Sequence, residues 1–339
     1  MTGQTGQTGG LAAVVVTCNR LKQLRLTVSR LLDSPVVEAL IVVDNASNDG
    51  TADWLAAQAD PRLRIVTEAE NTGGAGGFAR GMQEARDATT APWILLTDDD
   101  ARPEPEVLRG FFRQDRDAFD GWLAAVRYPS GRICEMNRPW LNPFRSVRAF
   151  RRTLRQGRAG FHLADNAYDG DVPTRVHGGS FVGLFLSRAA LSRGGLPDRR
   201  LFLYGDDVLY TLGLTRAGLR LALDPTLRFE HDCETLSEAG PVPVPLWKTY
   251  YLTRNRLRVY RRAAGPVLFW PVAALVAWRW SRAGRLAGDK RDAWRRLFRA
   301  GLRDGLTGQL GRRHPEVVAL SCSAESGRDG AATAEGQAP

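Results

Sequence analysis

Four short apolar runs alternate with amphipathic segments over the first hundred residues of the chain. Each run is continuous, which is typical of strands buried on both faces of a parallel sheet. The predicted strands are Leu11–Thr17, Ala39–Asp44, Leu63–Thr67 and Trp93–Thr97. Helical patterns lie between them, at Leu21–Leu32, after a capping Thr51, and at Gly77–Ala88. This alternation predicts βαβ units and a doubly wound α/β sheet.

The pattern changes after Gly121, where shorter elements begin. Residues 138–158 contain many arginines and no acid, and we expect them to form an exposed excursion. A further helix is predicted to start near Pro105, which suits a first helical turn. The later predicted elements are strands at Trp122–Tyr128, Ser180–Leu186, Leu219–Leu223 and Thr226–Glu230, and helices at Asp206–Ala217 and Leu246–Arg262.

Three adjacent carboxylates, Asp98-Asp99-Asp100, follow the fourth predicted strand. Ligands of open α/β sheets bind at the carboxyl ends of the strands. Adjacent carboxylates repel one another strongly unless a cation is present. Asp98 and Asp100 point to the same side of an extended chain, so they can share one hard cation that also bridges a diphosphate. The alternative is a solvated loop whose acids cap a helix.

A glycine-rich loop, Asn71 to Phe78, precedes the third predicted helix. Its glycines, Gly73 and Gly74 among them, let backbone approach a ligand closely, and a helix N-terminus favours phosphate. Gly74-x-Gly76-x-x-Ala79 also fits a dinucleotide-binding pattern. However, that pattern belongs directly after the first strand, so NAD or FAD is the weaker interpretation.

Two further features could carry chemistry. Asp206 and Asp207 begin a predicted helix, and one of two adjacent carboxylates can have its pKa raised, which suits a general base. The alternative is that both acids serve the helix dipole. His231 follows a late strand and is the best of four histidines to complete a metal site, although a structural role is the alternative. No GxSxG pattern supports nucleophilic hydrolysis.

The charge of the chain is unevenly distributed. Its formal net charge of +10 would suit a nucleic-acid-binding protein, yet residues 254–313 hold 16 basic and 3 acidic residues, which leaves −3 for the remainder. We therefore expect no nucleic-acid partner. The 43% hydrophobic content is ordinary for a globular protein and excludes wholesale disorder. The four cysteines show no paired spacing, which predicts reduced thiols and no cysteine-based zinc site.

The order of these motifs resembles the inverting, nucleotide-sugar-dependent glycosyltransferases of family 2, which have the GT-A fold. The resemblance covers roughly residues 11–235. It rests on Val14 to Thr17, Val42 to Thr51, Asn71-x-Gly73-Gly74, Asp98 to Asp100, Gly178-Gly179, Tyr204 to Asp207, and His231.

The resemblance implies roles for these residues. Asp98 and Asp100 match the pair that binds Mn²⁺ or Mg²⁺ with the donor diphosphate, and His231 matches a third metal ligand. Asp207 matches the catalytic base that deprotonates the acceptor hydroxyl. The implied donor-binding residues are Thr17, Arg20, Asp44, Asn71, Gly73, Gly74, Asp98 and Asp99, and the implied acceptor-side residues are Gly178, Gly179 and Asp206.

The glycine loop and the segment from Tyr250 to Arg256 are similar to bacterial galactofuranosyltransferases and rhamnosyltransferases. UDP-galactofuranose is therefore the expected donor, with dTDP-rhamnose as the alternative, and a lipid-linked cell-envelope glycan is the expected acceptor. Tyr210 and Leu214 depart from the family pattern after the base motif, where an acid and an arginine are frequent. A non-catalytic membrane- or nucleic-acid-binding protein with a degenerate core is the alternative from another class.

The C-terminal region is expected to contact membrane. The uncharged run Ala263–Trp278 has 16 residues and two prolines, fewer residues than the about 20 that span a bilayer. Tryptophans beside arginines suit the membrane interface, so residues 254–313 are predicted to bind an anionic surface on the cytoplasmic face of the inner or plasma membrane. The alternative is a helix that packs on protein.

The predicted organisation therefore has five parts. They are a flexible leader without a secretory signal over 1–10, a nucleotide-sugar-binding half over 11–120, an acceptor and catalytic half over 121–245, a basic helical region over 246–320, and a disordered tail over 321–339.

Overall fold

The computed structural model describes residues 10–233 and 242–322. The predicted leader and tail fall almost entirely outside these residues. The chain divides into two compact units, which are Met1–Glu238 with Arg261–Gly265, and Ala239–Tyr260 with Pro266–Pro339.

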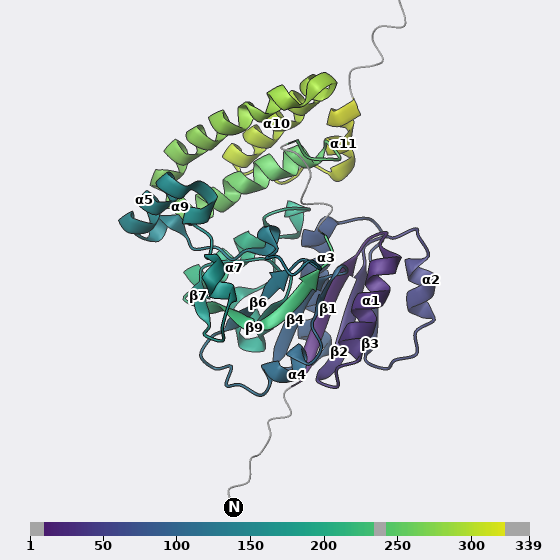
Figure 1. Ribbon diagram of the computed structural model, residues 1–339. Coiled ribbons are helices and arrows are strands. Elements are labelled where there is room, and N and C mark those ends of the chain that lie inside the picture. The colour runs from purple at the N-terminus through teal and green to yellow at the C-terminus, as the bar shows by residue number, and fades with distance from the viewer. Residues whose placement is uncertain (1–9, 234–241, 323–339) are drawn as a thin grey trace, which may run out of the picture. The chain divides into compact units, whose positions relative to one another are not determined.

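The described part of the first unit is built on a nine-stranded mixed sheet with the order β3-β2-β1-β4-β8-β6-β9-β5, and β7 also pairs with β9 (Figure 1). Strands β3, β2, β1 and β4 are parallel, as the apolar runs predicted, and β8 pairs antiparallel with β4. The strands are β1 (Leu11–Thr17), β2 (Val37–Asp44), β3 (Leu63–Thr67), β4 (Trp93–Asp98), β5 (Ala101–Pro103), β6 (Gly121–Arg127), β7 (Thr174–Val176), β8 (Leu184–Ser187) and β9 (Leu221–His231).

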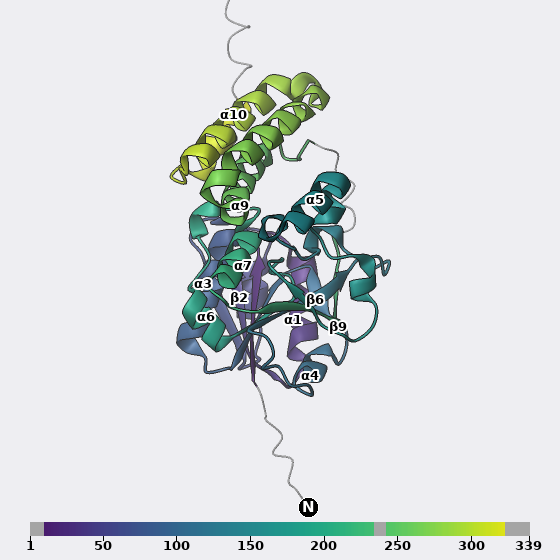
Figure 2. The ribbon, with the colours of Figure 1, turned by 90° about the vertical axis from the view of Figure 1, so that its left-hand side faces the viewer.

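Helices cover both faces of this sheet (Figure 2). Because side chains alternate along a strand, Val14 of β1 belongs to the core shared with α3, α6 and α7, while Val15 belongs to the core shared with α1 and α4. The α-helices of this unit are α1 (Leu21–Leu32), α2 (Thr51–Ala56), α3 (Gly73–Ala88), α4 (Val107–Phe111), α5 (Val147–Gln156), α6 (Arg188–Gly194) and α7 (Asp206–Arg216).

Two of the predicted late strands form one strand. The segment predicted at 226–230 and most of the segment predicted at 219–223 belong to β9, whose pairing with β6 shifts register between Asp224 and Arg228. Pro225 lies at this shift, and proline cannot donate a ladder hydrogen bond. The sequence pattern therefore indicated the interruption at Pro225, but in the structure the strand continues on both sides of it.

Several predicted helix starts are wrong by a few residues. Helix α3 begins at Gly73, earlier than predicted, and α4 begins at Val107, after Pro105. Thr51 is the first residue of α2 and does not cap it, because Gly50 occupies the N-cap position and the Thr51 hydroxyl donates to Asp49. Helix ends depend on such local contacts more than on periodicity.

The arginine-rich segment 138–158 is only partly an excursion. Helix α5 has no buried residue. Arg138, by contrast, is buried, with ion pairs to Glu135 and Asp165 and its guanidinium 5.5 Å from the ring centroid of Tyr168. Its partners lie outside the acid-free segment, so the local charge pattern could not reveal them.

The second unit is helical. It contains most of α9 (Lys248–Ser281), together with α10 (Arg291–Thr307) and α11 (His314–Cys322). Gly265 interrupts α9 with a φ of 75°, just before Pro266. Leu257 and Phe269 of α9 pack with residues of α10. Among the described residues, no helix combines the length and apolar character that crossing a bilayer requires.

Candidate active site

The carboxyl ends of β1, β2 and β4 lie side by side. Thr17 is in register with Asp44, and Val16 is in register with Asp98. The parallel register thus brings the last residues of three strands to one edge of the sheet. This is the edge at which α/β proteins bind their ligands.

Asp99 points into the protein and holds the loop after β4 in place. Its carboxylate accepts a hydrogen bond from Thr17 Oγ1 at 2.7 Å and lies 3.3 Å from the Arg20 guanidinium. Its backbone carbonyl accepts from Thr27 Oγ1 at 2.7 Å. Burial raises the pKa of Asp99 to about 7, although Arg20 and Thr17 act in the opposite direction.

Asp98, Asp100 and His231 converge beside this loop. Their ligand atoms all lie within 4.8 Å of one another. Strand β5 pairs with β9, so that Ala101 is in register with His231 and Asp232 N–H donates to the Asp100 carbonyl at 2.9 Å. This pairing brings His231 Nε2 to 3.0 Å from Asp100 Oδ1 across 131 residues of sequence.

These three side chains perturb one another strongly. Burial and the charge of Asp100 raise the pKa of Asp98 to about 6. Burial opposes charge on His231, but hydrogen bonds to Asp100 and Cys134 and the nearby carboxylates together raise its pKa to about 10. The site therefore concentrates negative charge that needs a positive partner. Arg20 supplies one such partner, 2.7 Å from Asp100 Oδ2.

Asp206 and Asp207 form the first turn of α7, as predicted, with Gly205 at its N-cap. Burial raises the pKa of Asp207 to about 6, while hydrogen bonds from the Val208 N–H and from Ser180 lower it. Burial and the charge of Asp207 raise the pKa of Asp206 further. The charge of Asp207 also raises the pKa of Asp98, so these two carboxylates lie within electrostatic reach of each other.

Asn45 and Asn71 shape the glycine loop. Asn45 accepts from Thr72 N–H at 2.9 Å and donates to Asn71 Oδ1 at 3.1 Å, and Asn71 Oδ1 accepts from Gly73 N–H at 2.8 Å. Gly73 has a φ of 70°, and a Cβ there would lie 2.0 Å from the Phe202 carbonyl oxygen. Only glycine fits this position. A Cβ on Gly74, by contrast, would meet no atom within 4 Å.

Gly178 and Gly179 allow their segment to pack against α7. The Gly179 N–H donates to Thr211 Oγ1 at 3.0 Å, and a Cβ on Gly179 would lie 2.0 Å from Leu123. Tyr210, which departs from the family pattern, has a structural role, since its hydroxyl donates to the Gly195 carbonyl at 3.0 Å. The two glycines therefore place the following residue, Ser180, beside Asp207.

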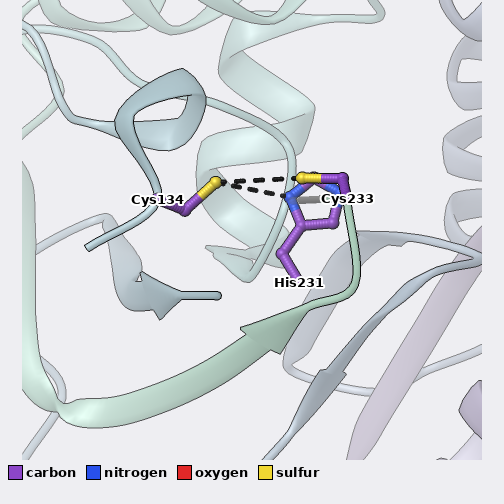
Figure 3. Close-up of side chains that lie close together, drawn as sticks. All are labelled: Cys134, His231 and Cys233. Carbon is purple, nitrogen blue, oxygen red and sulfur yellow. Dashed lines mark hydrogen bonds between the residues drawn. The ribbon is translucent and has the colours of Figure 1, made fainter. Parts of the chain in front are cut away.

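The sequence did not indicate the groups on the far side of the His231 ring. Asn137 Oδ1 accepts from His231 Nδ1 at 2.8 Å, and Cys134 Sγ lies 3.8 Å from the same nitrogen. Cys233 Sγ lies 4.0 Å from Cys134 Sγ (Figure 3). These residues stand almost a hundred positions apart and form no spacing pattern, so no sequence signal pairs them.

The mixed sheet with helices on both faces is an α/β fold of the GT-A type. Residues 12–179 match the family model "Glycosyl transferase family 2". Together with the 30% identity to a glycosyltransferase over 305 residues, this match shows that the chain belongs to the family and is a hexosyltransferase. This membership counts against the dinucleotide interpretation of the glycine loop.

Two curated relatives and one solved structure are similar to the chain. It is 30% identical over 305 residues to galactofuranosyltransferase GlfT1 of Mycolicibacterium smegmatis, covering 87% of this chain and 97% of that protein. It is 32% identical over 126 residues to undecaprenyl-phosphate mannosyltransferase of Micrococcus luteus, covering 35% of this chain and 49% of the relative. The fold resembles mannosyltransferase PcManGT from Pyrobaculum calidifontis in complex with GDP-Man and Mn²⁺, with a TM-score of 0.51, 16% identity, and coverage of 89% and 87%.

Proposed function

We propose that this enzyme is a metal-dependent, inverting galactofuranosyltransferase that acts on a lipid-linked glycan of the cell envelope. The observation that carries the proposal is the convergence of Asp98, Asp100 and His231 within electrostatic reach of Asp207. The likeness to galactofuranosyltransferase GlfT1 over nearly the whole length of that protein supports galactofuranose as the transferred sugar.

Asp98, Asp100 and His231 would hold one divalent cation. Two carboxylates and an imidazole suit Mn²⁺, and Mg²⁺ also accepts the carboxylates. The raised pKa of Asp98 fits such an ion, because a cation offsets the burial and the repulsion from Asp100 that raise it. When bound, the ion would neutralise the donor diphosphate and stabilise the departing nucleoside diphosphate. His231 would offer Nε2, since Asn137 accepts the proton on Nδ1.

Asp207 would act as the general base. Its pKa of about 6 leaves it ionised at neutral pH and close to the range that favours proton transfer. The carboxylate would take the proton of the acceptor hydroxyl while the hydroxyl oxygen attacks the anomeric carbon, on the side opposite the leaving diphosphate. One direct displacement inverts the anomeric centre and requires no covalent sugar intermediate. Asp206, whose pKa is raised by burial and by the charge of Asp207, would lie beside this base on the acceptor side.

The donor would bind along the carboxyl edge of the sheet. Asp44 would contact the nucleoside, and the loop from Asn71 to Gly74 would line the site, where Gly74 leaves open space for a ligand. Thr17, Arg20 and Asp99 would contribute mainly by fixing the loop that carries Asp98 and Asp100.

The acceptor would be presented at a membrane surface. Val267, Leu268, Trp270, Leu275 and Trp278 of α9 are exposed. Arg282 lies over the Trp278 ring at 3.7 Å, a pairing of aromatic and cationic groups that suits a lipid interface. Anionic lipid headgroups would attract the net charge of residues 254–313, on the cytoplasmic face where the nucleotide sugar is available. The undecaprenyl phosphate in the name of one relative supports a lipid-linked acceptor.

Protection against thermal unfolding by nucleotide sugars tests the donor. With Mn²⁺ present, UDP-galactofuranose should raise the unfolding midpoint more than dTDP-rhamnose or a GDP-sugar, because a ligand that binds only the folded state stabilises it. Transfer to a polyprenyl-linked acceptor should follow the same order. Preference for dTDP-rhamnose would contradict the sugar assignment. No protection and no turnover with any donor would favour the non-catalytic alternative.

A further inference from the structure

His231 lies between two different sets of ligand atoms. Its Nε2 faces the carboxylates of Asp98 and Asp100, which suit hard cations. Its Nδ1 lies 3.8 Å from Cys134 Sγ, and Cys134 Sγ lies 4.0 Å from Cys233 Sγ. Figure 3 shows the two sulfurs and the imidazole pointing toward one another. The second set therefore contains the ligands that thiophilic cations prefer.

The spacing of this second set matches a tetrahedral zinc site. With Zn–S bonds of about 2.3 Å and Zn–N bonds of about 2.0 Å, two sulfur ligands lie about 3.8 Å apart, and sulfur and nitrogen about 3.5 Å apart. The two distances from Cys134 Sγ, 4.0 Å and 3.8 Å, are within a few tenths of an ångström of these values, and all three ligand atoms lie within 4.8 Å of one another. We propose that Cys134, His231 and Cys233 form a binding site for a thiophilic divalent cation of the Zn²⁺ class.

The surroundings of the three ligands fit this use. All three are buried, and both cysteines are free thiols. The Met136 sulfur lies 3.6 Å from Cys233 Sγ, and Met136 is half exposed, so the cluster lies just beneath the surface. Asn137 Oδ1 or water would complete four-fold coordination, since Asn137 Oδ1 already contacts both Cys134 Sγ and His231 Nδ1.

Binding at this site changes the state of the imidazole. As the cation binds, the protons on the two sulfurs and the proton on His231 Nδ1 leave to solvent, so that a neutral His231 coordinates through Nδ1 and keeps its other proton on Nε2. Nε2 then donates to Asp100 and has no lone pair for a second cation. The soft site therefore competes with the donor-metal site for His231. This consequence rests on the proposed function, whereas the existence of the soft site does not.

Cobalt titration tests the site directly. Co²⁺ added to the metal-free, reduced full-length chain should give a thiolate-to-cobalt charge-transfer band and intense tetrahedral d–d bands, at one equivalent, that Zn²⁺ removes. Cys134→Ser and Cys233→Ser should each weaken the band and their combination should abolish it. Cys322→Ser, a matched control at an exposed cysteine, should retain it. Asp98→Asn should also retain it, since it changes only the oxygen set.

A measurement on the wild-type chain tests the site without relying on variants that could misfold. Zn²⁺ should protect Cys134 and Cys233 of the wild-type chain from alkylation, read by peptide mass spectrometry, and leave Cys322 reactive. Absence of the charge-transfer band, its survival in the double variant, or equal alkylation of all three thiols would overturn the site.

The competition has its own readout, the inhibition by Zn²⁺ of Mn²⁺-dependent turnover. Half-maximal inhibition should need at least about tenfold more Zn²⁺ in Cys233→Ser than in the wild type. Zinc that binds at the carboxylates would inhibit both proteins, so the difference between them reports the inhibition through the thiols. Equal inhibition with the band intact would overturn the competition for His231. Failure of the proposed function would be seen separately, because turnover would then survive the Asp98→Asn substitution.

Discussion

Asn137 donates a hydrogen bond from Nδ2 to Ser180 Oγ across 2.9 Å. Asn137 also accepts from His231 Nδ1, and Ser180 hydrogen-bonds to Asp207. Two neutral side chains thus connect the imidazole beside the acidic cluster to the proposed base. Because each hydrogen bond restricts the orientation of the next, the His231 imidazole and the Asp207 carboxylate are held in a fixed relation to each other.

Ser180→Ala tests this connection through the pH dependence of turnover. The Ser180 hydroxyl stabilises the charged form of Asp207, so its removal should raise the Asp207 pKa above about 6. A base works only when deprotonated, so activity is lost as the pH falls through its pKa. The acid limb of the kcat/KM profile should therefore move to higher pH by about one unit.

The controls separate this effect from loss of folding. Ser180→Thr keeps a hydroxyl and should restore the wild-type profile, and Ser192→Ala changes an exposed serine whose hydroxyl bonds only to the Arg188 carbonyl. An acid limb in Ser180→Ala that coincides with the wild type, at any level of activity, would contradict the assignment of Asp207 as the titrating base.

Asp98→Asn should separate activity from stability. Loss of one metal-binding carboxylate should lower turnover by about a hundredfold or more. The pKa of Asp98 is raised to about 6, which means that its charged form destabilises the folded, metal-free protein above that pH. A neutral amide should therefore raise the thermal unfolding midpoint at pH 7 without metal.

Asp53→Asn is a suitable control, because Asp53 is exposed and lies on α2, away from the cluster. It should change neither turnover nor the unfolding midpoint appreciably. Asp98→Asn turnover within about twofold of the wild type would remove Asp98 from the metal site.

Much of this site could be predicted because its signals are local. Continuous apolar runs identify buried parallel strands, and the acids at their ends must meet at one edge of the sheet. His231 is different. It reaches Asp100 only because β5 pairs with β9, and no local pattern specifies that pairing. The family resemblance predicts His231 as a metal ligand, and the pairing of β5 with β9 is what brings its side chain to Asp100.

The groups behind His231 could not be predicted for the same reason. Cys134 precedes a short 3₁₀ turn (η1, Glu135–Asn137), and Cys233 follows β9, so the fold alone makes them neighbours. Spacing rules for metal sites detect ligands close in sequence and miss ligands that come from distant strands. The expectation of no cysteine-based metal site followed from those rules, and the zinc-site proposal replaces it.

Two glycines of α3 should respond differently to alanine. A Cβ on Gly81 would lie 2.3 Å from Val14 and 3.0 Å from Val43, so Gly81→Ala should cost about 1–3 kcal/mol of unfolding free energy by overpacking. A Cβ on Gly74 meets nothing, so Gly74→Ala should leave stability unchanged. It should instead raise the KM for the nucleotide sugar if the open space receives the donor.

Urea unfolding and donor kinetics on both variants would check this contrast. A rise in stability for both would show that helix propensity, which favours alanine over glycine, and not contact with the strands, controls the response. An unchanged donor KM in Gly74→Ala would place the donor away from the loop.

The exposed tryptophans of α9 should contribute to membrane binding. Trp270→Ala combined with Trp278→Ala should weaken sedimentation with anionic vesicles several-fold, because interfacial aromatic rings add to the attraction of the basic residues. Raising the salt concentration should weaken wild-type binding as well, since it screens the charges. Val172→Ala removes an exposed apolar side chain from the first unit and should have no effect. Tryptophan variants that bind like the wild type would favour the alternative in which this surface packs on protein.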